Sequence, residues 1–246
     1  MAKTKIEWCD HTVNPVKGLC PVACSYCYGR RLYKRFGWDP TIRYEDPFWQ
    51  VHLMKYKKPS RVFVGSTMEL FGPWIRPSWM HSIMNYCRVC PQHTFIFLTK
   101  KPENLAKWKF PENCWVGTTA TNNAELRVGL QFLNAVDAKV RFASLEPLLS
   151  WNDRAVWDTE NRSLTRCLSD LDLIIIGQQT PVSKATTPKL EWIAEIVEAA
   201  DKEGVKIFLK DNLRPVLKLE DPLMGQAALD TGLLNWAGEL RQEFPA

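Results

Sequence analysis

Thr94-Phe-Ile-Phe-Leu-Thr99 is a short run of apolar residues between polar ends. A run of this length, without alternating polar positions, is typical of a strand that is buried on both faces of a sheet. Similar runs, each ending in polar or glycine residues, occur at Arg61-Val-Phe-Val-Gly65, Cys114-Trp-Val-Gly117, Lys139-Val-Arg-Phe-Ala-Ser144, Leu173-Ile-Ile-Ile-Gly177 and Val205-Lys-Ile-Phe-Leu-Lys210. We therefore predict buried strands at all of these positions.

Helix-patterned segments separate these runs, at residues 24–36, 77–87, 122–135 and 188–203. Pro188 suits the first turn of a helix, and Gly204 suits the residue after its last turn. Alternation of strands and helices predicts an α/β fold with a parallel sheet. With one more strand within residues 9–16, the count of six or seven units favours a partial or full TIM-like (β/α) barrel, in which ligands gather at the carboxyl ends of the strands.

The predicted barrel occupies residues 1–212, and residues 213–246 are predicted to form a C-terminal helical extension. Within this tail, residues 230–241 are the better helix candidate. Residues 150–169 are polar and favour a long loop or an insertion.

Composition sets wide limits on function. The chain has 246 residues, of which 46% are hydrophobic, and a formal net charge of +5, which permits contact with phosphates without requiring it. No apolar run approaches the roughly 20 residues of a membrane span. The chain opens without an apolar signal segment, so we expect a cytoplasmic protein with reduced thiols and no membrane association.

Cys20, Cys24 and Cys27 stand in the order C-x3-C-x2-C after the expected first strand. Three thiolates on one short loop can hold three irons of a cubic 4Fe-4S cluster. The fourth iron would keep an open position that a ligand with an amine and a carboxylate can chelate, and S-adenosyl-L-methionine (SAM) is such a ligand. The spacing therefore predicts a 4Fe-4S cluster that binds SAM.

A zinc site is the main alternative, because zinc needs four ligands in tetrahedral geometry. Cys9, His11 or the pair Cys87 and Cys90 would supply the fourth. Disulfides are less favoured in a reducing cytosol. We expect Cys87 and Cys90 to lie at the amino end of a strand, away from the ligand-binding edge.

Tyr26 directly precedes the last cysteine, and with this aromatic residue the loop resembles that of the radical SAM superfamily. The similarity extends over most of residues 4–212. Four further stretches are similar to landmarks of a phage-associated radical-SAM-like family whose members often occur beside a three-Cys-motif partner protein: Thr4-Lys-Ile-Glu-Trp-Cys-Asp-His-Thr-Val-Asn-Pro15, Arg61-Val-Phe-Val-Gly-Ser-Thr-Met-Glu-Leu-Phe71, Pro91-Gln-His-Thr-Phe-Ile-Phe-Leu-Thr-Lys-Lys-Pro102 and Arg141-Phe-Ala-Ser-Leu-Glu-Pro-Leu-Leu149.

The resemblance implies an enzyme in which the reduced cluster, supplied with electrons by a donor such as flavodoxin or ferredoxin, cleaves SAM to methionine and a 5'-deoxyadenosyl radical. The cofactor then performs the hard chemistry, abstraction of a substrate hydrogen. A three-Cys-motif protein is the implied partner. The family pattern differs after Leu173-Ile-Ile-Ile-Gly177, where many members have Gly-Gly-Glu-Ser-Gly and this chain has Gly177-Gln-Gln-Thr-Pro181.

Polar residues at consecutive strand ends are the candidate cofactor-binding residues. Ser66 and Glu69 are expected at the amino group of SAM, and Thr99 and Lys100 at its carboxylate. The ribose would contact Thr118, Ser144 or Glu146, and the adenine would pack on Tyr26. Structural alternatives remain for each: a helix-start acid for Glu69, a solvated lysine for Lys100, loop packing for Tyr26 and helix caps for the hydroxyl groups.

Basic residues after the cysteines suggest a substrate. Arg30, Arg31, Lys34 and Arg35 fall along one side of a helix, where they would hold phosphates or form a solvated face. Lys210, at the end of the last strand, is another candidate substrate residue. Three hypotheses remain: a radical SAM enzyme that modifies or repairs a nucleic acid or nucleotide, the same chemistry on a peptide or small metabolite, and a nonenzymatic metal-stabilised binding module.

Overall fold

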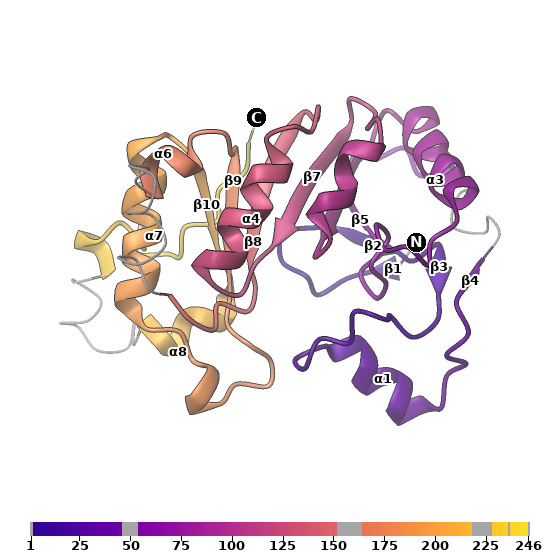
Figure 1. Ribbon diagram of the computed structural model, residues 1–246. Coiled ribbons are helices and arrows are strands. Elements are labelled where there is room, and N and C mark those ends of the chain that lie inside the picture. Colours follow the sequence, from indigo (N-terminus) through magenta and orange to yellow (C-terminus); the bar gives the residue numbers. More distant parts are fainter. Residues whose placement is uncertain (1, 46–53, 152–163, 218–227, 236, 246) are drawn as a thin grey trace. The chain divides into compact units, whose positions relative to one another are not determined.

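The computed structural model describes residues 2–45, 54–151, 164–217, 228–235 and 237–245 (Figure 1). The strands are β1 (Ala2–Lys3), β2 (His11–Val13), β3 (Val16–Lys17), β4 (Arg43–Tyr44), β5 (Arg61–Val64), β6 (Thr94–Thr99), β7 (Cys114–Thr119), β8 (Val140–Leu145), β9 (Leu173–Ile176) and β10 (Lys206–Leu209). The α-helices are α1 (Tyr28–Phe36), α3 (Pro77–Val89), α4 (Asn123–Leu133), α6 (Leu164–Leu168), α7 (Leu190–Lys202) and α8 (Arg214–Leu217). Short 3-10 helices span Pro102–Lys107, Lys184–Thr186 and Asp211–Leu213.

One sheet contains eight strands in the order β1-β2-β5-β6-β7-β8-β9-β10, and β3 pairs with β4 in a separate antiparallel ribbon. Seven strands of the large sheet are parallel, and β1 is antiparallel to β2. The parallel strands follow one another in chain order without the reversal of a doubly wound sheet. This is the topology of a partial TIM-like barrel, so the predicted fold class is confirmed.

All six predicted strands are present within two residues of their expected ends, and the further strand expected within residues 9–16 is β2. Their side chains are buried on both faces, as continuous apolar runs require: Phe95 and Ile96 of β6 and Ile174 and Ile175 of β9, which are neighbours and point to opposite faces, are at most 1% exposed. The chain divides into two compact units, Met1–Gly117 with Ala135–Lys139 and Thr118–Asn134 with Val140–Ala246.

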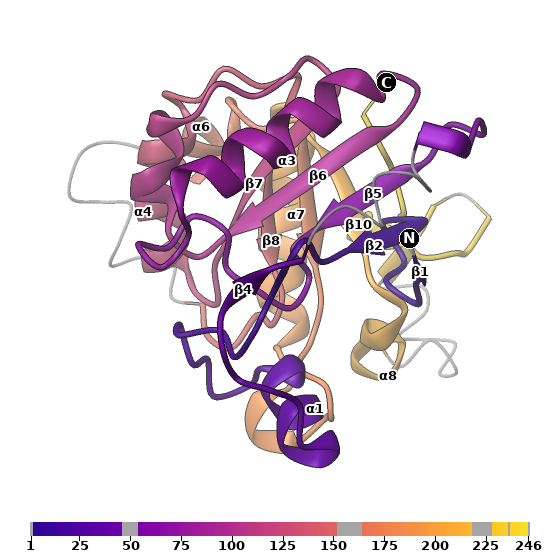
Figure 2. The same ribbon diagram turned by 90° about the vertical axis from the view of Figure 1, so that its right-hand side faces the viewer.

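In unit 1, α3 buries Met80, Ile83, Met84 and Cys87. The side chain of Asn113 links the end of α3 to the turn before β6. Its amide nitrogen donates to the backbone carbonyls of Cys87, Cys90 and His93. Both views show α1 below the strands of this unit (Figures 1 and 2), and the β3–β4 ribbon contacts α3 where the rings of Tyr44 and Trp79 stack, with centres 6.0 Å apart. The cysteine loop connects β3 of this ribbon to α1.

In unit 2, side chains cap the N-terminus of α4. Asn122 accepts the backbone N–H of Glu125, and the Glu125 carboxylate accepts both the N–H and the hydroxyl of Thr121. Gly129 of α4 allows close packing, because a Cβ there would lie 2.6 Å from Cγ2 of Thr118. Helix α7 buries Ile193, Ile196 and Val197. The close contact between Gly129 and Thr118 places α4 beside the end of β7.

The helix predicted at residues 230–241 is wrong. After a helical turn at residues 228–230, the described residues turn twice, at Gly232 and Gly238, whose φ angles are 68° and 76°. The side-chain oxygen of Asn235 accepts the backbone N–H groups of Ala237 and Glu239, which competes with helix formation. Helix α8 does begin the tail as expected. Of the loop predicted at 150–169, residues 152–163 lie outside the described residues, and Leu164–Leu168 form helix α6 instead. No described helix has the length and apolar character needed to cross a membrane.

Candidate functional site

The cysteine loop connects β3 to α1. Gly18 opens it with a φ of 117°, and a Cβ there would lie 2.7 Å from the Cα of Ile42, so only glycine allows the loop to pass so close to that backbone. The N–H of Leu19 donates to the carbonyl of Pro40. Predicted helix 24–36 begins later, at Tyr28, because residues 20–27 make turns instead.

Cys20, Cys24 and Cys27 are all free thiols and all half-buried. The backbone N–H of Cys27 donates to the carbonyl of Cys24, and Cys27 directly precedes α1. No group of three or more His, Cys, Asp or Glu side chains among the described residues is placed to hold a single metal ion. In a cubic cluster each cysteine would bind a different iron, so the donor set fits a cluster in kind and number.

The sulfur of Cys20 faces the segment after β5. Burial raises the pKa of the Cys20 thiol, while hydrogen bonds from the backbone N–H groups of Glu69 and Val22 act in the opposite direction. The Cys27 thiol and the Glu69 carboxylate add smaller effects that also raise this pKa, which places both within electrostatic range of Cys20. The structure thus brings the cysteine loop next to Glu69, as the sequence predicts for strand-end residues.

Glu69 is buried, with 7% of its surface exposed, and its carboxylate ties two strand ends together. One oxygen accepts the N–H of Phe71 at 3.0 Å and the hydroxyl of Thr99 at 2.7 Å. The other accepts the backbone N–H of Lys100 at 2.7 Å. These three donors occupy three of about four acceptor positions of a carboxylate, so one position remains for a further donor.

Three other predicted residues surround this network. The Lys100 ammonium lies 5.9 Å from the centre of the Tyr26 ring, a cation–π contact that joins the end of β6 to the cysteine loop. The hydroxyl of Ser66 donates to the side-chain oxygen of Asn14, which also accepts the N–H of Thr67. Unit 1 therefore brings together the three cysteines, Tyr26, Ser66, Glu69, Thr99 and Lys100.

In unit 2, the alternation of β7 separates two neighbouring threonines. Thr118 lies against Gly129 of α4, so its side chain points toward that helix. Thr119 therefore points to the opposite face of the strand. A ligand on the face away from α4 would therefore meet Thr119 and not Thr118.

Several buried polar atoms of unit 2 have no hydrogen-bond partner among the described residues, and three of them lie at strand ends: Thr119 Oγ1, Ser144 Oγ and Gln178 Oε1. These residues stand at or just beyond the ends of β7, β8 and β9, which are neighbours in the sheet. Buried polar groups without partners are rare in folded proteins. Gln178 was not predicted; the signal available was its position directly after the apolar run Leu173-Ile-Ile-Ile-Gly177.

Glu146, after β8, forms an ion pair with Lys210, after β10. Gly177 leaves room for this pair, because a Cβ there would lie 2.9 Å from Lys210 Cδ and 3.3 Å from Glu146 Cγ. Asn212 bonds the backbone of Gln178 through both its oxygen and its nitrogen. Glu146 and Lys210, both predicted site residues, thus pair with each other in this structure.

Two groups of predicted residues lie elsewhere. Arg31, Lys34 and Arg35 are exposed on α1, and Arg30 is half-buried there. Cys87 and Cys90 are 1% exposed in the core of unit 1, before β6, as expected for the amino end of that strand. Burial and the neighbouring thiol of Cys114 raise the pKa of Cys87.

Comparison of the chain with known proteins identifies its family. No curated protein and no solved structure matches the chain. The profile of the family described as "Protein of unknown function (DUF5131)" matches residues 3–215, which is most of the chain. This match covers the cysteine loop and all of the strands from β2 to β10, and the chain accordingly belongs to the DUF5131 family.

Proposed function

We propose that this protein is a radical SAM enzyme that binds a 4Fe-4S cluster through Cys20, Cys24 and Cys27. The observation that carries the proposal is the placement of a three-cysteine loop next to a strand-end carboxylate: Glu69 is close enough to Cys20 for its backbone and its carboxylate to shift the pKa of that thiol. When bound, the reduced cluster would supply one electron that breaks a carbon–sulfur bond of SAM, giving methionine and a 5'-deoxyadenosyl radical.

The chain's own residues would hold and orient these groups. Backbone N–H groups near cysteine sulfurs tune the reduction potential of a cluster, and at Cys20, where burial raises the pKa of the thiol, those of Glu69 and Val22 act to lower it. The remaining acceptor position of Glu69 suits an ammonium group. Lys100, held at the ring of Tyr26, supplies a cation for a carboxylate.

Unit 2, taken by itself, offers a second set of polar groups. Buried Thr119 Oγ1, Ser144 Oγ and Gln178 Oε1 would gain partners from a ligand that carries hydroxyl groups. A ribose or a polar group of the substrate has this chemistry. The expected roles of Thr118, Ser144 and Glu146 at the ribose stay predictions, with Thr119 preferred to Thr118.

The substrate that we propose is a nucleic acid or a nucleotide. Helix α1 follows Cys27 directly and has four basic residues and no acidic one over Tyr28–Phe36. Phosphate groups are the natural partners of such a helix. A peptide or a small metabolite is the alternative substrate class for the same chemistry.

Anaerobic reconstitution tests the cofactor. We expect about four iron and four sulfide per chain, with the absorption of a 4Fe-4S cluster. Alanine at Cys20, Cys24 or Cys27 should abolish the cluster. Cys87→Ala and Cys90→Ala are the matched controls and should keep it, because both thiols lie outside the loop. A protein that binds one zinc tightly and shows no iron–sulfur absorption contradicts the proposal and favours a nonenzymatic metal-stabilised module.

A further inference from the structure

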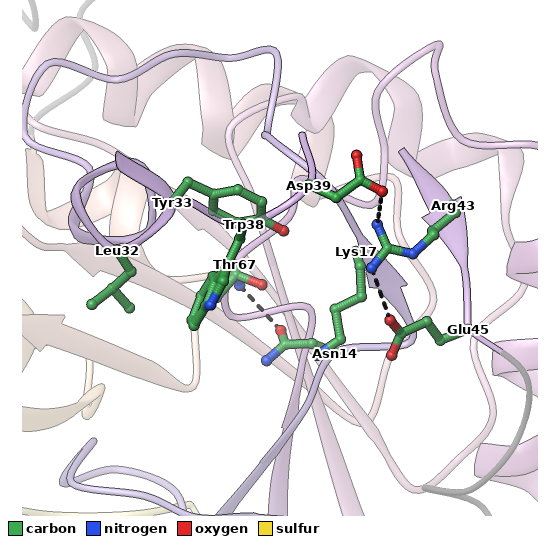
Figure 3. Close-up of a pocket in the computed structure, with 9 residues that line it drawn as sticks. All are labelled: Asn14, Lys17, Leu32, Tyr33, Trp38, Asp39, Arg43, Glu45 and Thr67. Atoms are coloured by element: carbon green, nitrogen blue, oxygen red, sulfur yellow. Dashed lines mark hydrogen bonds and ion pairs between the residues drawn. The ribbon is translucent and has the colours of Figure 1, made fainter. Parts of the chain in front are cut away.

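A pocket of about 360 Å³ lies within unit 1, between α1, the β3–β4 ribbon and the turn after β5. Tyr33 and Trp38 line one side of it, and Arg43 stands on the other, with Asn14 and Lys17 between (Figure 3). Its volume is within the range of small-molecule sites. Neither the cysteines nor Glu69 line this pocket, so it is separate from the proposed cluster site.

Flat groups gather at the edge of the pocket. Trp38 stacks on Phe36 with ring centres 5.4 Å apart and planes 22° apart, and the guanidinium of Arg35 lies 5.3 Å from the Phe36 ring centre. Yet Phe36 is 54% exposed and Trp38 is 47% exposed. An exposed stack of large rings beside a pocket is a surface on which a flat ligand can stack.

The chain holds Trp38 firmly. Gly37 ends α1 in the left-handed conformation, with φ at 59°, which turns the chain so that the N–H of Trp38 donates to the carbonyl of Tyr33 at 3.3 Å. The Tyr33 ring then meets Trp38 edge-on at 5.3 Å. The Tyr33 hydroxyl accepts the N–H of Gly18 at 2.7 Å, two residues before Cys20. Trp38 is therefore fixed relative to the cysteine loop.

Charge around the pocket favours an anion. Helix α1 carries Arg30, Arg31, Lys34 and Arg35, and Lys17 lines the pocket. The two acidic side chains of the wall, Asp39 and Glu45, both pair with Arg43, at 2.9 and 3.3 Å. Lys17 balances the remaining negative charge, so the wall is neutral and the excess of positive charge comes from α1. Cations beside stacked aromatic rings are the features by which proteins bind single-stranded nucleic acid.

We infer that this pocket is a base-binding subsite for single-stranded nucleic acid. One base stacks on Trp38 and enters the pocket, and the flanking phosphates lie along the basic side of α1. A duplex hides the faces of its bases, so the rings select a single strand. The inference rests on the proposed function for the chemistry that follows binding, and it narrows the substrate of that function from nucleic acid or nucleotide to a single-stranded polymer.

Fluorescence anisotropy with labelled single-stranded DNA and RNA oligonucleotides, and with a duplex of the same sequence, tests this inference at low salt. We expect the full-length protein to bind a single strand more tightly than the duplex. Trp38→Ala should weaken binding about 5-fold to 150-fold, the loss of one stacked base. Arg31→Gln with Lys34→Gln should reduce the slope of log affinity against log salt by about 1.4.

Trp192→Ala is the matched control. Trp192 also has a cation over its ring, Lys189 at 5.4 Å, but it lies on α7 among Glu191, Glu195 and Glu198. This variant should bind as the wild type does. Trp38→Phe, which keeps a ring, should restore most of the affinity that Trp38→Ala loses, and this rescue distinguishes stacking from a folding defect.

Equal affinity for single strand and duplex would overturn the inference, and so would wild-type binding by Trp38→Ala. Binding to phosphatidylserine vesicles that depends on Trp38, without binding to oligonucleotides, would overturn it in favour of a membrane surface. The two proposals fail separately. SAM cleavage without oligonucleotide binding removes this subsite alone, whereas oligonucleotide binding by a protein that cannot hold a cluster removes the proposed function alone.

Discussion

Glu69→Gln is the substitution that probes the strand-end network most directly. A glutamine keeps one carbonyl oxygen and places an amide N–H₂ at the other position. If the oxygen stays with Phe71 and Thr99, the backbone N–H of Lys100 faces a donor; if the amide flips, the N–H of Phe71 does. Thr99 can reverse its hydroxyl, but a backbone N–H cannot. One donor is therefore left without an acceptor in either orientation.

The size of the effect follows from this count. A donor left unsatisfied costs about 1–3 kcal/mol, and the remaining bonds lose their charge assistance. Burying a neutral amide instead of a carboxylate recovers part of this cost. We expect the free energy of unfolding to fall by about 2 kcal/mol. In urea, this corresponds to a midpoint lower by about 1 M at an unchanged slope.

Glu125→Gln provides the control for this measurement. A single oxygen of Glu125 accepts both the N–H and the hydroxyl of Thr121, so a glutamine can keep both bonds. Glu125 is also exposed. We expect a loss of about 0.5 kcal/mol or less at this position. Equal midpoints for the two variants would refute the argument that the Glu69 carboxylate joins the two strand ends.

Three further predictions concern other parts of the chain. Glu69→Gln should also weaken SAM binding by about 1.5–3 kcal/mol, measured by calorimetry on the cluster-loaded protein, because a charge-assisted bond to the ammonium is lost; unchanged affinity would mean that the cofactor does not meet Glu69. Gly129→Ala should lower the free energy of unfolding by about 1–3 kcal/mol through its contact with Thr118, and adding Thr118→Ala should recover most of that loss in the same denaturation assay. The pKa of Asp39 is lowered from its ordinary value of 3.8 by hydrogen bonds from Thr41 and by Arg43, so the carboxylate stabilises the turn after Trp38 above that value and loses this effect as the pH falls through the lowered pKa. NMR titration should place the Asp39 pKa below 3.8, and Arg43→Gln should raise it; a value at or above 3.8 in the wild type would disprove the contacts.

The strands could be predicted because each is a continuous apolar run with polar ends. Thr94–Thr99 appears with the same bounds in the sequence pattern and in the structure. Chain order along the sheet followed from the regular alternation with helices. The structure of the tail could not be predicted from its sequence pattern. Residues 230–241 have helix-compatible spacing, but Asn235 and two glycines at positive φ form turns instead.

The candidate site was predicted in part. Strand ends located Glu69, Thr99 and Lys100, and the structure joins them through one carboxylate. Which of Thr118 and Thr119 faces a ligand depends on the packing of Gly129 of α4 against Thr118, which no local pattern reveals. The stack of Phe36 and Trp38 escaped prediction for a related reason: it depends on the left-handed turn at Gly37, which folds Trp38 back onto α1.

Cofactor cleavage is the most direct test of the central claim. The anaerobically reconstituted protein should be reduced with dithionite in the presence of SAM, and 5'-deoxyadenosine and methionine quantified by chromatography. We expect both products in equal amounts from the wild type and none from Cys27→Ala, because this residue is one of the three proposed cluster ligands. A wild-type protein that is loaded with iron and sulfide but leaves SAM intact would contradict the proposed function.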